Sequence, residues 1–194
     1  MGGGPLREGS PGRAICVYCA SADGIPTRYL DLARDVGAGV AARGWELVSG
    51  GSRLSMMGAV ASAARAGGAR TTGVMPRSMV AREWADDGSD ELLVVETMRE
   101  RKAVMEERAD AFLTLPGGIG TCEEFFEIWT SGTLGLHRKP VVVLDPDGHY
   151  AGLLDWLQGL GARGFLHGPA LARFTIVTDV DRALDACARS VTGR

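Results

Sequence analysis

The feature that most constrains the fold of this 194-residue chain is a regular alternation of short apolar runs with longer helical patterns. The runs are rich in Val, Ile and Leu and almost continuous, as in strands that are buried on both faces. The alternation therefore predicts a parallel sheet covered by helices on both sides, in a single domain. The expected strands are Ala14–Ala20, Glu46–Ser49, Arg70–Met75, Glu91–Val95, Ala111–Leu115, Val141–Asp145 and Phe174–Val177. The expected helices are Pro26–Arg43, Met56–Ala66, Met98–Arg108, Cys122–Leu134, Tyr150–Leu160 and Asp179–Ala188.

Residues 1–13 precede the first apolar run and lack the apolar segment of a signal peptide. We expect them to form a disordered tail ahead of a domain that spans residues 14–194. No apolar run approaches the roughly 18 residues that a membrane span needs. The net charge of −3 gives no sign of a nucleic-acid-binding or membrane-binding surface. These features predict a cytoplasmic protein whose partners include neither nucleic acid nor membrane.

The cysteine and histidine residues do not form a recognisable metal site. Cys16 and Cys19 are spaced as C-x2-C, but their odd separation on a strand places them on opposite faces. No second Cys or His pair follows, and His137, His149 and His167 are scattered. We therefore expect ordinary core cysteines and neither a metal nor an organic cofactor.

Three unusual loops follow expected strands: CASADG at residues 19–24, SGGSRLSMMG at residues 49–58 and PGGIGT at residues 116–121. Ligands of parallel α/β proteins bind at the carboxyl ends of the strands, so all three loops belong to the edge where a ligand is expected. The third loop presents bare glycine backbone directly ahead of a helix, and this combination favours an anion, most often a phosphate. Thr121 is expected to cap that helix and to offer its hydroxyl to a phosphate oxygen. A P-loop lysine is absent, and GIGTCE lacks the last glycine of a dinucleotide fingerprint.

Two acids follow this loop, and we expect both in the first turn of the helix. Glu123 is explained by the helix dipole. Glu124 lies beside the expected phosphate, where a carboxylate is unfavourable unless it serves chemistry. On the preceding helix, Met98, Arg101 and Met105 share one face, which directs Arg101 toward the interior edge. Arg101 and Lys102 are the expected cations for the phosphate, whereas Arg99 belongs to a solvated face.

With these residues identified, the chain resembles the "Lonely Guy" (LOG) family of cytokinin riboside 5′-monophosphate phosphoribohydrolases, which are often labelled lysine decarboxylases. The resemblance covers about residues 14–189. The family pattern P-G-G-x-G-T-x-x-E is met by Pro116, Gly117, Gly118, Gly120, Thr121 and Glu124, and M-x-x-R-K by Met98, Arg101 and Lys102. Similar stretches are V-Y-C-x-S, which ends at Ser21, the double glycine Gly50–Gly51, Met57–Gly58, and Met75 to Glu83.

The resemblance implies a Rossmann-like, doubly wound fold, a homodimer or higher homo-oligomer, and hydrolysis of the N-glycosidic bond of a nucleoside 5′-monophosphate without a cofactor. Arg101 and Glu124 take the catalytic places. The positions that correspond to substrate contacts are Ser21, Gly51, Met57, Glu83, Arg101, Lys102, Gly117, Gly118, Ile119, Gly120, Thr121, Glu124 and Thr130. The apolar FFEIW run at residues 125–129 is expected to face a partner subunit.

The sequence departs from the family at Ala20, Ser52, Ser55 and Arg99, and the first three replace glycines. These departures bear on base preference more than on the reaction. Two other functions stay open at this point. One is a nucleotide or cofactor carrier without turnover, and the other is a pyridoxal phosphate decarboxylase, for which no lysine has a recognisable context.

Overall fold

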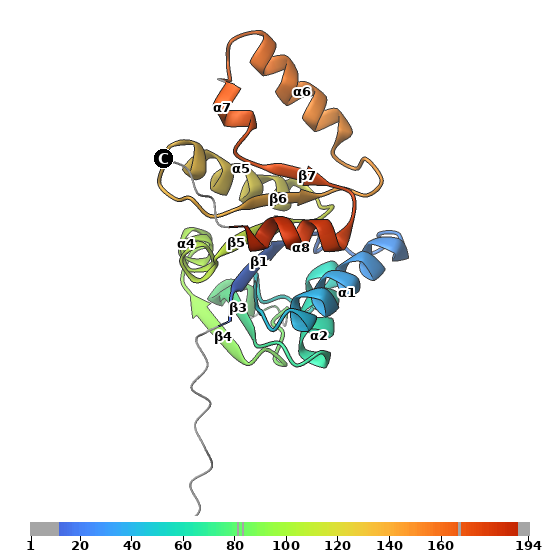
Figure 1. Ribbon diagram of the computed structural model, residues 1–194. Coiled ribbons are helices and arrows are strands. Elements are labelled where there is room, and N and C mark those ends of the chain that lie inside the picture. Colours follow the sequence, from blue (N-terminus) through green and yellow to red (C-terminus); the bar gives the residue numbers. More distant parts are fainter. Residues whose placement is uncertain (1–11, 81, 83, 167, 190–194) are drawn as a thin grey trace, which may run out of the picture.

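All seven expected strands pair in one parallel sheet, which has the order β4-β3-β2-β1-β5-β6-β7 (Figure 1). This computed structural model describes residues 12–80, 82, 84–166 and 168–189. The strands are β1 (Ala14–Tyr18), β2 (Glu46–Ser49), β3 (Thr71–Pro76), β4 (Glu91–Val95), β5 (Ala111–Thr114), β6 (Val141–Leu144) and β7 (Thr175–Val177). The prediction of a single-domain parallel α/β fold is confirmed, with strand ends shifted by at most two residues.

The six expected helices are present, together with two four-residue helices that were not predicted. The helices are α1 (Thr27–Ala42), α2 (Ser55–Ala66), α3 (Arg77–Val80), α4 (Met98–Arg108), α5 (Ile119–Thr133), α6 (Ala151–Ala162), α7 (Gly168–Leu171) and α8 (Val180–Ala188). Helices α3 and α7 are too short to show a hydrophobic period, so no pattern along the chain predicts them.

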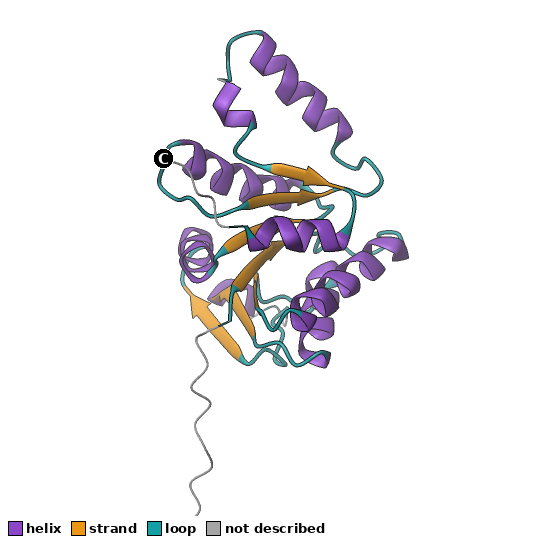
Figure 2. Ribbon diagram, in the orientation of Figure 1, coloured by secondary structure: helices purple, strands orange, loops and turns teal. Residues whose placement is uncertain are grey.

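Helices cover both faces of the sheet, as a doubly wound fold requires (Figure 2). Helices α1, α2 and α8 pack on one face, and α4 and α5 pack on the other. Strand β1 shows why its sequence is apolar throughout. Ile15 and Val17 point into the first layer, whereas Cys16 and Tyr18 point into the second. Cys19 joins the first layer, so the two cysteines are buried, free and on opposite sides, as predicted.

The strand order reverses between β1 and β5, and this reversal determines where a ligand can enter. The chain winds outward from β1 through β2 and β3 to β4, and then returns past β1 to start β5. The loops that leave the carboxyl ends of β1 and β5 therefore diverge toward opposite faces of the sheet. The Ala20 N–H donates to the Pro116 carbonyl at 3.3 Å and holds the two loops together at their base.

The FFEIW run of α5 is covered within the chain, so our reason for expecting a partner at this place is wrong. Phe125, Ile128 and Trp129 are buried. The Trp129 indole N–H donates to the Ala170 carbonyl at 2.7 Å, and its ring packs edge-to-face against Phe174. The segment from α6 to β7, which lies at the β7 edge of the sheet in Figure 1, provides this cover.

Arg13 ties the start of the domain to α8 and to β2. Its guanidinium donates to the Cys187 carbonyl at 2.8 Å, and its own carbonyl accepts from the Glu46 N–H. Residues 1–11 of the expected tail and the final five residues of the expected domain lie outside the described residues. No helix among the described residues is long and apolar enough to cross a membrane.

Ser55, at the start of α2, has a φ of +49°, a left-handed conformation that is costly for a residue with a Cβ atom. Its hydroxyl is also buried and has no hydrogen-bond partner among the described residues. Ser55→Gly removes both penalties, at the cost of a more flexible unfolded chain. We expect it to raise the free energy of unfolding by about 1 kcal/mol, measured by urea denaturation. Ser55→Ala keeps the strained Cβ and should gain less, so a glycine variant less stable than the alanine variant would contradict this explanation.

Candidate active site

Arg101 is a buried cation that contacts strand β3, the loop after β2 and helix α5. Its side chain extends from α4 and is 8% exposed. Its Nε donates to the Val74 carbonyl at 3.1 Å, and its Nη2 donates to the Gly50 carbonyl at 3.2 Å. The Nη1 atom lies 3.7 Å from Oε1 of Glu124 on α5. The expectation that Arg101 points to the interior edge is confirmed, and Arg99 is exposed as expected.

The backbone at Gly50 leaves room for the guanidinium of Arg101. A Cβ atom at Gly50 would lie 1.7 Å from Nη2, so any other residue would displace the arginine. The double glycine is visible in the sequence, but its link to Arg101 appears only in the fold. The Val74 carbonyl, which also orients this side chain, left no signal in the sequence, because every residue provides a backbone carbonyl.

Glu124 lies in a setting that favours its protonated form. Burial raises the pKa of this carboxyl to about 7, although the nearby Arg101 and Lys102 act in the opposite direction. On the β1 side, burial also raises the pKa values of Cys16, Tyr18 and Cys19, so these neighbours stay neutral. An adjacent guanidinium would by itself keep a carboxyl ionised. At neutral pH the carboxyl is instead poised between its two forms, which suits an acid–base group.

The glycine loop leads into α5 three residues earlier than predicted. Gly118 is the N-cap residue, with an extended backbone and no side chain to cap the helix. Thr121 is therefore inside the first turn, where it is 4% exposed, and the expectation that it caps the helix is wrong. Gly117 permits this arrangement, since a Cβ there would lie 2.2 Å from the Thr121 hydroxyl oxygen. The two acids consequently follow the first turn rather than forming part of it.

The open side of this loop is free of side chains. A Cβ atom at Gly118 or at Gly120 would meet no described atom within 4 Å, and Ile119 is 91% exposed. The first N–H groups of a helix have no partner within the helix, so those at the start of α5 are available to a ligand. The arrangement is suited to an anion that approaches the start of α5.

The carbonyl groups of the loop are held from behind by the segment between β6 and α6. The Tyr150 hydroxyl donates to the Leu115 carbonyl at 2.7 Å, and the His149 ring lies 2.9 Å from the Gly117 carbonyl oxygen. Asp145 in turn accepts from the backbone N–H groups of both His149 and Tyr150. These contacts fix two carbonyl groups of the loop. No motif in the sequence selects His149 or Tyr150 for this purpose.

Lys102 is occupied by two carboxylates. Its ammonium group forms ion pairs with Glu123 and with Glu127, the latter at 2.7 Å. Burial lowers the pKa of Lys102, but hydrogen bonds to these two acids outweigh that effect and raise it overall. Glu123 is thus explained by Lys102 rather than by the helix dipole. A phosphate would have to compete with both acids for this cation.

The other expected site residues lie at varying distances from the Arg101–Glu124 pair. Gly51 follows Gly50, whose carbonyl accepts from Arg101, and a Cβ atom at Gly50 would lie 3.2 Å from the Met57 sulfur. Ser21 is exposed in the β1–α1 loop. Thr130 is exposed on the Glu123–Glu127 side of α5, roughly 9 Å along the axis from Glu124. Glu83 lies outside the described residues.

The geometry thus defines a class of protein, namely a Rossmann-like α/β protein with a buried Arg–Glu pair beside an open glycine loop at a helix N-terminus. Among the described residues no group of three or more His, Cys, Asp or Glu is placed to hold a metal ion. Residues 57–187 match the family described as "Possible lysine decarboxylase".

Curated relatives give the family a more specific name. The cytokinin riboside 5′-monophosphate phosphoribohydrolase of Mycobacterium marinum is 54% identical over 94% of this chain and 97% of its own length. The protein of that name from Mycobacterium tuberculosis is 53% identical over 91% of this chain and 94% of its own length. The rice enzyme LOG (Oryza sativa subsp. japonica) is 43% identical over 79% of this chain and 64% of its own length. This chain belongs to the LOG family.

Solved structures with lower identity share the fold. A molybdenum cofactor binding protein from Rippkaea orientalis is 19% identical, with a TM-score of 0.72 over 95% of this chain and all of that one. The molybdenum cofactor carrier protein of Chlamydomonas reinhardtii is 21% identical, with a TM-score of 0.69 over 90% of this chain and 95% of that one. At this level of identity the likeness concerns the fold alone.

The raised pKa of Glu124 makes the stability of the protein depend on pH. In the folded chain the carboxyl titrates near 7 instead of the ordinary 4.5, so ionisation destabilises the fold as pH rises between about 4.5 and 7. A pKa difference of about 2.5, at about 1.4 kcal/mol per unit, amounts to roughly 3 kcal/mol. We expect Glu124→Gln to gain stability relative to the wild type by about that amount between pH 4.5 and pH 8, measured by urea denaturation. Glu123→Gln is the matched control, and an equal gain for both variants would argue against burial of Glu124 as the cause.

Proposed function

We propose that this chain hydrolyses the N-glycosidic bond of adenosine 5′-monophosphates, including N6-modified ones, to give free base (a cytokinin or adenine) and ribose 5-phosphate. The observation that carries the proposal is the buried Arg101–Glu124 pair, which lies beside the open N-terminus of α5. The names of the curated relatives support the same reaction. The decisive experiment is to incubate the protein with AMP and with isopentenyladenosine 5′-monophosphate and to measure the free base released.

In the proposed mechanism Glu124 stabilises positive charge that develops on the ribose. Cleavage of a glycosidic bond passes through an oxocarbenium-like state, and a nearby carboxylate interacts with that state more strongly than with the neutral sugar. An acid with a pKa of about 7 in the free protein also suits a base that orients or deprotonates the attacking water. Arg101 contacts the ribose hydroxyls or the phosphate with the side of its guanidinium that faces Glu124.

The phosphate is proposed to bind at the start of α5. Its proposed ligands are the backbone N–H groups from Gly118 to Thr121; the open space at Gly118 and Gly120 and the contacts of His149 and Tyr150 to the Gly117 and Leu115 carbonyls support this placement. A phosphate held there lies away from the reacting bond, so its binding energy orients the ribose against Glu124. Lys102 contributes to phosphate binding only if its pairing with Glu123 and Glu127 is rearranged.

A lysine decarboxylase that uses pyridoxal phosphate does not fit the residues present. The chain has two lysines, and a Schiff base requires one of them as a free amine. Lys102 is held between two carboxylates that raise its pKa, and Lys139 donates to the Glu106 carbonyl at 2.6 Å while its ammonium lies over the Phe112 ring. Neither lysine has the surroundings that produce a reactive amine.

A carrier without turnover is the second candidate, because two proteins of the same fold are named as a molybdenum cofactor binding protein and a molybdenum cofactor carrier protein. A carrier would bind nucleotide stoichiometrically, whereas an enzyme would release many equivalents of base per chain. The homodimer, the cytoplasmic location, the extent of the domain and the substrate contacts of Glu83 and Thr130 stay predictions.

Glu124→Gln keeps the size of the side chain and removes its charge. If the carboxylate acts on the transition state, kcat should fall by on the order of a hundredfold or more, while the affinity for ribose 5-phosphate changes little. In the wild type, kcat/KM should rise with pH through about 7 as Glu124 ionises. Glu123→Gln should leave turnover close to normal. Release of free base at a near-normal rate by folded Glu124→Gln would end the proposed role.

Ile119→Pro tests the backbone phosphate site directly. Ile119 is the first residue of α5, where proline fits the helix but lacks the N–H group. Gly118 is already extended, as a residue before proline prefers. Loss of one charge-assisted hydrogen bond should lower kcat/KM for AMP by roughly tenfold or more, because such a bond contributes about 1.5–3 kcal/mol.

Ile119→Ala is the control for this change, because it removes the same exposed side chain but keeps the N–H. Paired kinetics on AMP and adenosine complete the test. Adenosine should be a far poorer substrate for the wild type and should be unaffected by the proline. Equal losses for the proline and alanine variants, or comparable wild-type rates on the two substrates, would place the phosphate elsewhere.

A further inference from the structure

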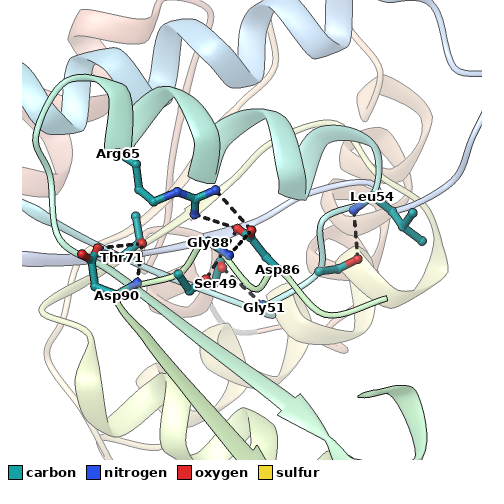
Figure 3. A network of polar contacts seen from close by, with 10 residues as sticks. Ser49, Gly51, Leu54, Arg65, Thr71, Asp86, Gly88 and Asp90 are labelled. Carbon is teal, nitrogen blue, oxygen red and sulfur yellow. Dashed lines mark hydrogen bonds and ion pairs between the residues drawn. The ribbon is translucent and has the colours of Figure 1, made fainter. Parts of the chain in front are cut away.

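An ion pair between a half-buried arginine and a buried aspartate lies outside the proposed site and holds the segment that follows α3. Arg65, near the end of α2, binds Asp86 with both ends of its guanidinium, at 2.7 Å from Nη1 to Oδ2 and 3.2 Å from Nη2 to Oδ1 (Figure 3). Asp86 is 7% exposed, and its Oδ1 also accepts from the Gly88 N–H at 3.2 Å. Bidentate, largely buried pairs of this kind are strong and geometrically specific.

Asp86 fixes the glycine turn after β2 through its own backbone. Its N–H donates to the Gly51 carbonyl at 2.9 Å. Ser52 and Ala85 form an antiparallel bridge, and the Arg53 N–H donates to the Trp84 carbonyl at 3.0 Å. Residues 51–53 are therefore tied to residues 84–86, whose position is set by Arg65.

The same turn is in direct contact with the arginine of the proposed site. The Gly50 carbonyl accepts from Nη2 of Arg101, and the guanidinium approaches the Gly50 Cα so closely that a Cβ would overlap it. A shift of the turn therefore moves or releases one side of the guanidinium. The other side of that group lies 3.7 Å from the Glu124 carboxylate.

We propose that Arg65 and Asp86 are positioning residues for the Arg101–Glu124 pair, because together they hold the Gly50–Gly51 turn against the Arg101 guanidinium. Neither residue touches the reacting atoms in this proposal. The catalytic consequence rests on the proposed function, whereas the geometric consequence does not.

The charged groups that face Glu124 indicate how the effect can be observed. Arg101 and Lys102 approach it from α4, Glu123 and Glu127 from α5, and the neutral Cys16, Tyr18 and Cys19 from the β1 side. Burial has the largest influence on the Glu124 pKa, and Arg101 opposes it most strongly. Arg101 is also the group of this set that contacts Gly50. Loosening the turn therefore weakens the opposition to burial and raises the Glu124 pKa further.

The test is a carbon-13 NMR titration of the Glu124 carboxyl in the full-length protein, with the signal assigned by its loss in Glu124→Gln. Arg65→Met keeps the apolar stem and removes the bidentate partner of Asp86. We expect the midpoint of the Glu124 titration to rise by about half a pH unit or more, which is a threefold change in the ionisation constant. Arg65→Lys keeps one charge and should give a smaller shift.

Arg70→Met is the matched control. It breaks the nearby Arg70–Glu91 pair, at 3.2 Å, by the same chemical change, but within the described part of the chain Arg70 makes no hydrogen bond to the glycine turn. It should leave the Glu124 titration unchanged. Asp86→Asn removes the charge from the other partner and serves as a second variant if Arg65→Met does not fold. An unaltered Glu124 titration in either folded variant would overturn the proposal.

The kinetic readout separates this proposal from the proposed function. If AMP is cleaved, the acidic limb of kcat/KM should move to higher pH in Arg65→Met by the same amount as the NMR midpoint. If AMP is not cleaved by the wild type but the NMR midpoint still shifts, the positioning role stands and the assigned reaction fails. If AMP is cleaved and neither the limb nor the midpoint moves, the reaction stands and the positioning role fails.

Discussion

The buried guanidinium of Arg101 is the constraint on which the arrangement of the ligand edge depends. A cation taken out of water must be compensated, and here two backbone carbonyls and one carboxylate do so from three different parts of the chain. The carbonyls belong to Val74, within β3, and to Gly50, just after the end of β2. The position of the arginine is therefore determined by the sheet rather than by α4 alone. A shift of either strand end would leave a buried charge with an unsatisfied donor, which is costly.

Glu124 experiences two opposing effects, and burial is the larger one. An arginine 3.7 Å away lowers the pKa of a carboxyl, yet the carboxyl of Glu124 titrates near 7. The reason is that Arg101 already gives its Nε and Nη2 donors to carbonyls, and that Cys16 and Tyr18 present a neutral wall on the sheet side. The negative charge of ionised Glu124 is therefore only partly compensated by Arg101, so a bound ligand can change the ionisation of Glu124. A substrate that brings positive charge toward it would complete the compensation.

The sequence predicted the layers of this fold better than the detail of its site. Strand positions follow from apolar runs, and the face of Arg101 follows from helical spacing, both of which are local signals. The start of α5 was misplaced because a glycine, Gly118, takes the N-cap position without a side chain that marks it. The pairing of Lys102 with Glu123 and Glu127 requires α4 and α5 to pack side by side. Lys102 and Glu123 are 21 residues apart in the sequence, and no pattern along the chain predicts their contact. The role of Asp86 likewise depends on its contact with Arg65, which only the fold brings close to it.

The departures from the family pattern concern the backbone around the ligand more than the reacting groups. Ser52, in place of a glycine, accepts from the Leu54 N–H at 3.2 Å, so its hydroxyl stabilises the turn locally. Ser55 keeps a left-handed backbone that favours the glycine it replaces. Ala20 is buried at the base where the first and third loops meet, and its N–H holds that junction. The hydrogen bonds and ion pairs of Arg101 and Glu124 run to other residues. The three departures are therefore confined to the loops after β1 and β2 and the start of α2, and the buried Arg101–Glu124 pair does not depend on their side chains.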